Sequence, residues 1–316
     1  MKKIAAVILY ILAVVLIIPL IAVLLTGGFF KCPTANGEFK EKINVYVTKE
    51  DAVKEMDTSQ YLKEVVAAEM PADFSFEALK AQAVAARTYL ISKSQKKENI
   101  PEHKGADVCT DYNHCKAWMS EEERKNLWEE DKRDEYWDKI SRAVTDTAGK
   151  VLTYEDEPIT AVFHSTSSGM TEKAEDVWGT DVAYLQNVES EGDELSPRYS
   201  SEFSCDITEY CEKIEQAVSG VDWSLGLFSD IVRSEAGGII SLKVGGVQIK
   251  GTQFREIFGL RSTNAEIERQ DNTIIMTVKG NGHGVGMSQY GANYLGNSGK
   301  SYEEILSKYY PGTKLQ

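Results

Sequence analysis

Two helices joined by a tight turn are predicted by residues 66–89, VAAEMPADFSFEALKAQAVAARTY. The first helix begins near Thr58 or Ser59, either of which can cap it, and the proline of the quoted stretch stops it. Ser75 can cap the second helix, which runs to about Ser94. Alanine fills much of the second helix, and its small side chain permits close approach. We therefore expect the two helices to pack against each other.

Glu69 lies near the C-terminal end of the first helix, two residues before Pro71. That end of a helix carries partial negative charge, and the alanine and methionine neighbours supply little hydrogen bonding. Both effects should raise the pKa of the carboxyl group toward that of a general acid at neutral pH. The alternative is a solvated glutamate at a helix end with no catalytic role.

Two basic residues of the second helix, Lys80 and Arg87, lie seven positions apart. They therefore share one face of that helix. On that face they could bind a carboxylate or a hydroxyl-rich ligand. The alternative is that both are ordinary surface residues.

The chain around this helical pair is predicted to be an α+β protein, with a helical first half and a strand-rich second half. Residues 121–148 are expected to form a charged helix with one apolar stripe, and residues 206–218 another helix. No linker divides residues 43–316, so we expect one catalytic domain. The expected strands are 43–47, 151–154, 159–163, 228–234, 239–244, 247–250 and 273–278.

Two histidines stand where predicted strands of the second half run into loops. His164 follows the strand 159–163, and His283 lies in GNGHGVGMSQYGA, residues 280–292. The glycines around His283 expose backbone amides and allow a ligand to approach closely, which is typical of a binding loop. The segment has neither the Gly-Lys-Ser/Thr ending of a phosphate-binding loop nor the acidic partner of a dinucleotide-binding loop.

The cysteines fall into two pairs of equal spacing and one single residue: Cys109/Cys115, Cys205/Cys211 and Cys32. The first pair follows His103 with regular spacing, His103-x5-Cys109-x5-Cys115, and His114 stands beside the last cysteine. Thiols and imidazoles are the ligand types that zinc selects. We expect a mainly structural zinc ion held by His103, Cys109 and Cys115, with a disulfide as the alternative. For the second pair, a disulfide or two free thiols are both open.

The first 30 residues are predicted to be a membrane anchor. The uncharged run Ile4–Leu25 would reach about 33 Å as a helix, enough to cross a hydrocarbon core of about 30 Å. It is longer than the apolar region of a usual cleavable signal peptide. Because Lys2 and Lys3 precede it, the N-terminus should stay cytoplasmic. Residues 31–42 would then be a tether, and the domain 43–316 would lie outside the cell membrane.

The motifs of the soluble part together resemble the stage II sporulation protein D family, peptidoglycan lytic transglycosylases of endospore-forming bacteria. One departure is Ser168, where the family pattern has a second glycine. The family also has an N-terminal membrane anchor. The blocks that carry the resemblance, in chain order, are Ala68–Pro71, Glu77–Tyr89, Phe163–Gly169, Val177–Gly179, Gly251–Arg255 and Gly282–Ala292.

The resemblance implies cleavage of the β-1,4 bond between N-acetylmuramic acid and N-acetylglucosamine during engulfment, on glycan that an amidase has stripped of peptides. Glu69 falls on the family's catalytic position. It would protonate the leaving oxygen and then, as a carboxylate, accept the proton of the muramyl C6 hydroxyl, which leaves a 1,6-anhydro end. Lys80 and Arg87 would bind the lactate carboxylate of the muramyl residue or orient Glu69. The sugar groove would be lined by His164, Ser165, His283, Ser288 and Tyr290.

The expected partners are glycan strands, the membrane, a sporulation amidase and other engulfment membrane proteins. A formal net charge of -14 argues against nucleic acid as a partner. One alternative function is a serine hydrolase that uses Ser165 with His283. His164 stands next to Ser165, but neighbouring residues on one strand point apart, and no Gly-x-Ser-x-Gly elbow is present. A second alternative is a wall-binding scaffold without catalytic activity.

Overall fold

The computed structural model of the chain describes residues 40–95, 100–111 and 114–316. These residues contain two separate hydrophobic cores within one compact unit. The α+β class, with a helical first half and a strand-rich second half, is confirmed. No helix in these ranges is long and apolar enough to cross a membrane. The predicted membrane span and Cys32 lie outside the described residues.

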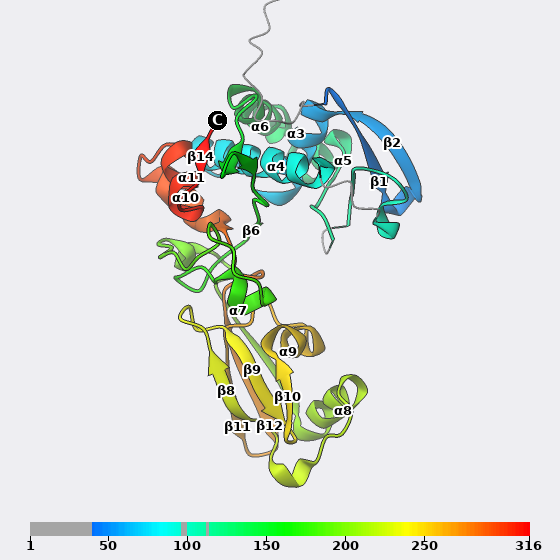
Figure 1. Cartoon of the computed structure of the whole chain (residues 1–316), viewed down its shortest axis with the longest axis vertical. Coiled ribbons are helices and arrows are strands. Elements are labelled where there is room, and N and C mark those ends of the chain that lie inside the picture. The colour runs from blue at the N-terminus through cyan, green and yellow to red at the C-terminus, as the bar shows by residue number, and fades with distance from the viewer. Residues whose placement is uncertain (1–39, 96–99, 112–113) are drawn as a thin grey trace, which may run out of the picture. The chain divides into compact units, whose positions relative to one another are not determined.

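The first core draws its elements from both ends of the described chain (Figure 1). Those before the second core are β1 (Lys42–Val47), η2 (Thr48–Glu50), β2 (Ala52–Asp57), α3 (Thr58–Glu69), α4 (Phe76–Gln95), η3 (Pro101–His103), β3 (Val108–Cys109), α5 (Glu121–Leu127), η4 (Glu130–Lys132), α6 (Arg133–Asp146), β4 (Leu152–Tyr154), β5 (Glu157–Pro158), β6 (Phe163–His164) and α7 (Ala174–Trp178). Those after it are β13 (Met287–Ser288), α10 (Gln289–Asn297), α11 (Tyr302–Tyr309) and β14 (Lys314–Leu315).

The predicted helical pair, α3 and α4, lies at the centre of this core. Ser75 accepts a hydrogen bond from the Ala78 amide and so starts α4 as expected. Asp57, not Thr58 or Ser59, caps α3, because its carboxylate accepts from a backbone amide of the first turn. Both helices contact α6 as well as each other (Figure 1).

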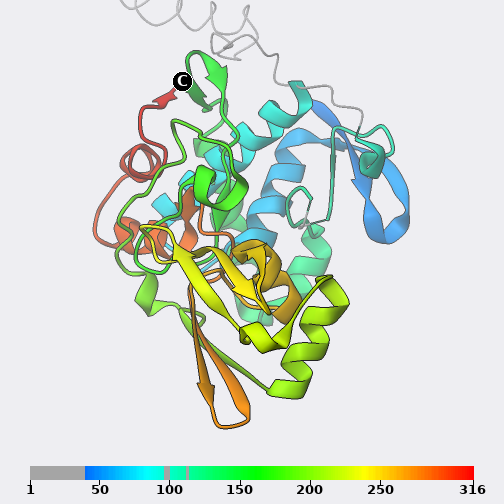
Figure 2. The same ribbon diagram turned by 60° about the horizontal axis from the view of Figure 1, so that its bottom comes forward.

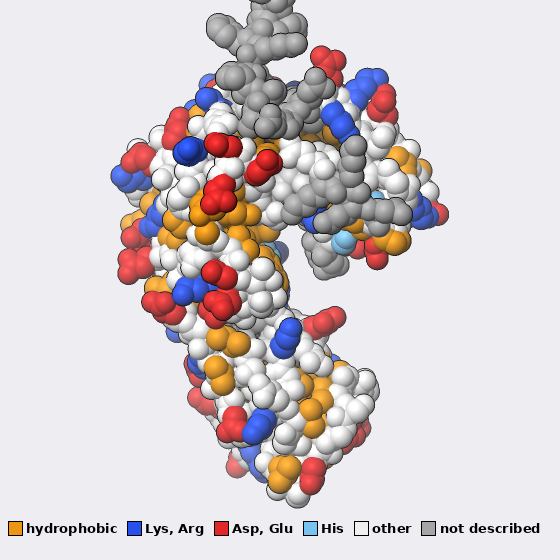
Figure 3. All heavy atoms as spheres, viewed as in Figure 1, with side chains coloured by type: hydrophobic (Ala, Val, Ile, Leu, Met, Phe, Trp, Pro, Cys, Tyr) orange, Lys and Arg blue, Asp and Glu red, His pale blue; other side chains and the backbone are white. Residues whose placement is uncertain are grey.

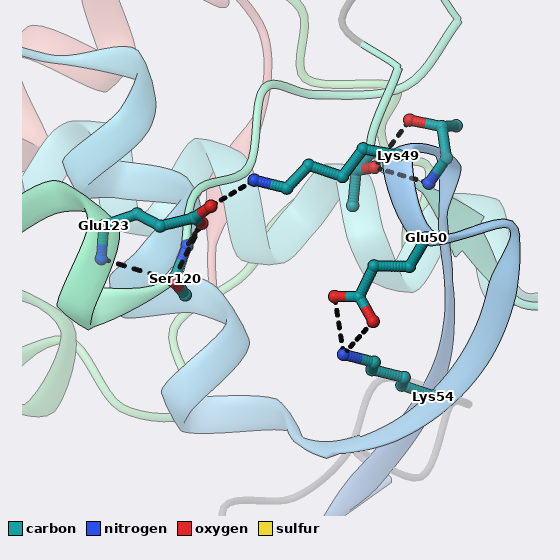
Figure 4. Close-up of polar contacts among 7 residues, drawn as sticks. Lys49, Glu50, Lys54, Ser120 and Glu123 are labelled. Atoms are coloured by element: carbon teal, nitrogen blue, oxygen red, sulfur yellow. Dashed lines mark hydrogen bonds and ion pairs between the residues drawn. The ribbon is translucent and has the colours of Figure 1, made fainter.

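The long helix expected over residues 121–148 is divided into α5 and α6. Trp128 ends α5 in an extended conformation, and its ring packs edge-on against Tyr136 with the centroids 5.5 Å apart. Ser120 and Glu123 form a capping box at the start of α5, and Lys49 pairs with Glu123 (Figure 4). The ion pair thus fastens the turn between β1 and β2 to α5.

The second core is formed by a segment inserted between α7 and β13. Figures 1 and 2 both show β8, β9 and β10 beside α9, and β11 paired with β12. The sequence predicts five of these elements but misses the helix α9 and the strands β7 and β11, whose residues are mostly polar. Before the second core, η5 (Asp193–Leu195) contacts α10 of the first. The elements of the second core are β7 (Ser200–Asp206), α8 (Ile207–Ala217), η6 (Trp223–Leu225), β8 (Ser229–Arg233), β9 (Ile239–Val244), β10 (Val247–Lys250), α9 (Gly251–Phe258), β11 (Ala265–Gln270) and β12 (Thr273–Lys279).

A short parallel pair, β6 with β13, brings the two histidine-bearing segments together. Gly282 and Gly286 belong to the loop before β13, and both have positive φ, 117° and 73°. A Cβ atom on Gly286 would lie 2.2 Å from the Val162 carbonyl oxygen, and one on Gly282 would lie 2.8 Å from the His164 side chain. Only glycine therefore fits at these two positions, where the two segments approach each other closely.

Asp193 is a fully buried carboxylate that ties three segments to each other. It accepts hydrogen bonds from the Ser167 amide and hydroxyl, from Ser190 and from Ser288. Four hydrogen bonds from neutral donors satisfy both carboxylate oxygens. This cluster fixes the loop after β6 against the start of α10.

Arg87 has a structural position, because its side chain is buried under the C-terminal end of α6. Nη2 donates to the Val144 carbonyl, and Nη1 donates to the carbonyls of Thr147 and Lys150. Carbonyls at the C-terminal end of a helix lack hydrogen-bond donors within the helix, and the guanidinium of Arg87 donates to them instead.

Arg87→Met is expected to destabilise the protein by about 2–4 kcal/mol, because it leaves these buried carbonyls without hydrogen-bond donors. Urea unfolding of the purified domain measures the change. Arg269→Met, at an exposed position near the end of β11, serves as the control and should change stability by less than about 0.5 kcal/mol. Equal effects of the two substitutions would contradict the structural role of Arg87.

Candidate functional site

Glu69 ends α3 with its carboxylate turned toward the loop that follows β3. Its Oε1 accepts a 2.8 Å hydrogen bond from the backbone amide of Ala117. Burial raises the pKa of the carboxyl, while the Lys116 ammonium and the Ala117 amide act in the opposite direction. The upward shift of the Glu69 pKa agrees with the sequence-based expectation, and burial is the main cause of the shift. The raised pKa lets this carboxyl keep its proton to a higher pH than an exposed glutamate does, as a general acid requires.

Lys116 is a buried cation between Glu69 and two aromatic rings. Its Nζ lies 3.7 Å from the ring centroid of Phe163 and 4.5 Å from that of Tyr89. Burial lowers the pKa of Lys116 to about 8, and the Glu69 carboxylate acts against this shift. The two rings stabilise an ammonium that little water reaches. Lys116 therefore places positive charge where the Glu69 carboxylate would form.

A row of three rings adjoins this pair. The ring of His283 lies 5.7 Å from that of His164 and 5.3 Å from that of Trp178. His283 is also within electrostatic range of Lys116. Burial lowers the pKa of His164 to about 4 and that of His283 well below its usual value. Both imidazoles are therefore neutral at physiological pH.

The hydrogen bonds of the two histidines define their tautomers. Nδ1 of His164 donates to the Val285 carbonyl, which leaves its Nε2 as an acceptor, buried and without a protein partner. Nδ1 of His283 accepts from the Val285 amide, so its proton is on Nε2. The His283 proton is taken by the backbone of Phe163, and the Nε2 acceptor of His164 is buried behind His283, so both rings are tied into the fold.

Not all of the other residues predicted to contact the substrate lie beside Glu69 and His283. Lys80 pairs with Glu77 and lies over the rings of Phe76 and Tyr302, on the side of α4 that faces α11. Its predicted contact with substrate has no support in this arrangement, and the same holds for Arg87, whose guanidinium is bonded to carbonyls.

Ser288, predicted to line the groove, is instead fully buried. It caps α10 and donates to Asp193, so it fixes the loop from behind. Tyr290 is partly buried, and its ring packs edge-on against Phe74 with the centroids 4.9 Å apart. The prediction for Ser288 as a residue of the groove surface is wrong because its hydroxyl is needed at the helix start.

Ser165 and His283 do not form a nucleophile pair. The Ser165 hydroxyl hydrogen bonds with Thr166 Oγ1 at 3.2 Å, while Nδ1 of His283 is occupied by the Val285 amide. A serine nucleophile needs a base within hydrogen-bonding distance. The geometry therefore gives no support to the serine hydrolase alternative.

Four residues of the loop between α4 and α5 bring their ligand atoms together: His103, Cys109, His114 and Cys115. All four atoms lie within 4.8 Å of one another, and both thiols are free. His103 Nε2 lies 3.1 Å from Cys115 Sγ and from His114 Nδ1, and His114 Nδ1 lies 3.4 Å from Cys109 Sγ. Three of these ligands are predicted from the sequence, and the structure adds His114.

The cluster fits a tetrahedral zinc ion. Zinc bonds of about 2.0–2.3 Å would place the ligand atoms roughly 3.3–3.8 Å apart, close to the spacings above. The pKa of the Cys115 thiol is lowered, chiefly by its hydrogen bond with Cys109 and further by His103, as a metal-binding thiolate requires. A closed set of two thiols and two imidazoles is typical of structural zinc. The second cysteine pair, Cys205 and Cys211, consists of free thiols on β7 and α8.

The structure also shows functional candidates that the sequence did not reveal. Lys116 is one lysine in a polar loop, and nothing in the pattern marks it as buried. Trp178 occurs in a motif of the resemblance, but only the structure places it beside His283. A small pocket of about 10 Å³, room for about one water molecule, borders His283 on another side and is lined by Thr166, Ser168, Glu172, Asn264 and Lys279 among others.

These features define an α+β protein with a helix-end glutamate site and an adjoining Cys/His cluster. A family model described as "Stage II sporulation protein" matches residues 46–154. The chain is 38% identical to "Stage II sporulation protein D" of Bacillus amyloliquefaciens over 273 residues, which are 86% of this chain and 78% of that relative. The protein of the same name from Bacillus subtilis is also 38% identical, with the same shares covered. The chain therefore belongs to the stage II sporulation protein D family.

A more distant relative is the "Amidase enhancer" of Bacillus subtilis. It is 30% identical over 305 residues, which cover 80% of this chain and 40% of that protein. A role of this chain in sporulation is consistent with its family.

The raised pKa of Glu69 predicts a pH dependence of stability. The folded protein binds the Glu69 proton more tightly than the unfolded chain does. This proton therefore stabilises the fold fully below the unfolded pKa of about 4.3, and its contribution is lost as the pH rises through the pKa of the folded state. Glu69→Gln removes the titration. The unfolding free energy of the wild type, relative to the variant, should therefore fall as the pH rises from about 4 through the raised pKa of folded Glu69. Chemical denaturation at each pH measures it, and parallel curves would contradict the shift.

Proposed function

We propose that this protein is a lytic transglycosylase that cleaves the β-1,4 bond between N-acetylmuramic acid and N-acetylglucosamine in peptide-stripped peptidoglycan during spore formation. The single observation that carries the proposal is the Glu69 carboxyl, which is partly buried, raised in pKa and bonded to the Ala117 amide. Membership of the sporulation family supports the biological setting.

One carboxyl group suffices for this reaction. Glu69 donates its proton to the glycosidic oxygen as the bond to the sugar breaks. The resulting carboxylate then accepts the proton of the muramyl C6 hydroxyl, whose oxygen attacks the anomeric carbon and closes a 1,6-anhydro ring. No water molecule is consumed, so a second carboxylate to activate one is unnecessary.

Lys116 and the Ala117 amide assist the two proton transfers. Both favour the carboxylate form of Glu69, so they stabilise the state reached after the first transfer. Burial favours the protonated form of Glu69, which is the form needed before the first transfer. The balance of these effects keeps the carboxyl able to act first as an acid and then as a base. His283, Ser165 and Tyr290 remain the proposed contacts of the sugar, whereas His164 is buried and supports His283 from behind.

A zinc ion at the Cys/His cluster belongs to the same proposal. His103, Cys109, His114 and Cys115 would hold it, and its contribution would be to cross-link their loop. Lys116 and Ala117 directly follow Cys115 in the sequence. The cross-link would therefore keep both groups in place against Glu69.

The cellular setting completes the proposal. The predicted anchor would hold the domain outside the cell membrane, where peptidoglycan lies. A sporulation amidase would supply the peptide-free glycan, and other engulfment proteins would share the site of action. Acidic and basic side chains are mixed over the face shown in Figure 3. With the net charge of -14, long-range attraction to an anionic wall is not expected, and binding would be local.

Glu69→Gln should lower glycan cleavage by roughly 10²- to 10⁴-fold while the domain stays folded, because an amide cannot transfer the proton. The measurement is the release of soluble fragments from peptide-stripped glycan. Ser165→Ala is the matched control, and it should retain activity if the serine only contacts sugar. Normal cleavage by Glu69→Gln would place the catalyst elsewhere, and complete loss in folded Ser165→Ala would revive the hydrolase alternative.

Protein purified without chelator should contain about one zinc ion per chain, and Cys109→Ser should lose it together with thermal stability. Elemental analysis and thermal unfolding measure the two effects. Cys205→Ser is the matched control and should keep the metal. Absence of zinc, with Cys109 and Cys115 titrating as thiols only after reduction, would show a disulfide in its place.

A further inference from the structure

Trp178 exposes 45% of its surface although it ends a helix that packs on the first core. Gly179 follows it in the left-handed conformation, with φ 77°, and stops α7 there. Burial of a tryptophan ring normally contributes strongly to stability, so an exposed ring next to a candidate site suggests a ligand.

The ring of Trp178 is held in place by its neighbours. His283 lies against it at 5.3 Å between centroids, and His164 backs His283 at 5.7 Å. Hydrogen bonds to the backbone of Val285 orient both imidazoles. The exposed aromatic surface is therefore the outer member of a rigid row rather than a freely rotating side chain.

The same row connects Trp178 with the catalytic carboxyl. The Lys116 ammonium, which lowers the pKa of Glu69, lies 3.7 Å from the ring centroid of Phe163, and Phe163 directly precedes His164 in β6. Hydroxyl, amide and carboxyl groups that line a small pocket also lie beside His283. A flat apolar face and hydrogen-bonding groups thus flank one histidine. A pyranose ring needs this combination, because its carbon-bound hydrogens form an apolar face and its hydroxyls form a polar rim.

We propose that Trp178 is a stacking platform for one sugar ring of the bound glycan, beside His283 and outside the bond-breaking site. The inference rests on the proposed function, since that supplies the ligand class. The neutral histidines suit an uncharged sugar face. Trp178 contributes affinity and positions the strand, and Glu69 alone transfers protons.

The test is glycan binding to the Glu69→Gln protein, which avoids turnover. Isothermal titration with peptide-stripped glycan of defined length gives the reference Kd. Adding Trp178→Leu should raise the Kd about tenfold, because leucine keeps apolar character but lacks a flat face. Adding Trp178→Tyr should raise it by less than about threefold. Leu225→Ala, at an exposed leucine of the second core region, should leave the Kd unchanged.

A second measurement needs no substitution at Trp178. Oxidation by N-bromosuccinimide, mapped by peptide mass spectrometry, should be slowed at Trp178 by bound glycan and unaffected at Trp223, which packs in the second core. Equal Kd values for the leucine variant and its parent, or unchanged oxidation of Trp178, would overturn the platform.

Cleavage by the wild type separates this inference from the proposed function. If the wild type cleaves and Trp178→Leu binds as its parent does, only the platform fails. If binding depends on Trp178 but the wild type does not cleave, the platform stands and the proposed function fails. If the parent binds no glycan, the platform fails whatever the cleavage result.

Discussion

The parallel pairing of β6 with β13 is the contact on which the rest of the candidate site depends. It joins Phe163 to Met287 and His164 to Ser288, although the whole second core lies between them in the sequence. Phe163 then lies under the Lys116 ammonium, and His164 lies behind His283. Asp193 secures the pairing through serine hydroxyls from both segments.

Local patterns in the sequence were sufficient to predict the helical pair, most strands of the second core and the position of Glu69. They were sufficient because proline, alanine content and strand alternation act over a few residues. The division of α5 from α6 was missed, since it depends on the packing of Trp128 against Tyr136. β7 was missed as well, because it alternates in burial through polar residues and takes its register from β12.

The site was predicted only where one segment carries it. Glu69 and three members of the Cys/His cluster each lie in a local motif, but Lys116 and Trp178 gain their roles from distant contacts. The sequence predicts Arg87 as a ligand-binding group from its spacing to Lys80, and the resemblance implies the same for Ser288. Their hydrogen bonds show instead that they support helix ends and buried loops. Spacing alone cannot distinguish these two uses of a polar side chain.

The central claim is that Glu69 breaks the glycan by proton transfer without water. Mass spectrometry of the fragments that the wild-type domain releases from peptide-stripped glycan tests it most directly. The account predicts 1,6-anhydromuramyl ends, lighter by one water molecule than hydrolysis products, and their disappearance with Glu69→Gln. Fragments with reducing muramyl ends, or anhydro fragments that persist in the folded variant, would contradict it.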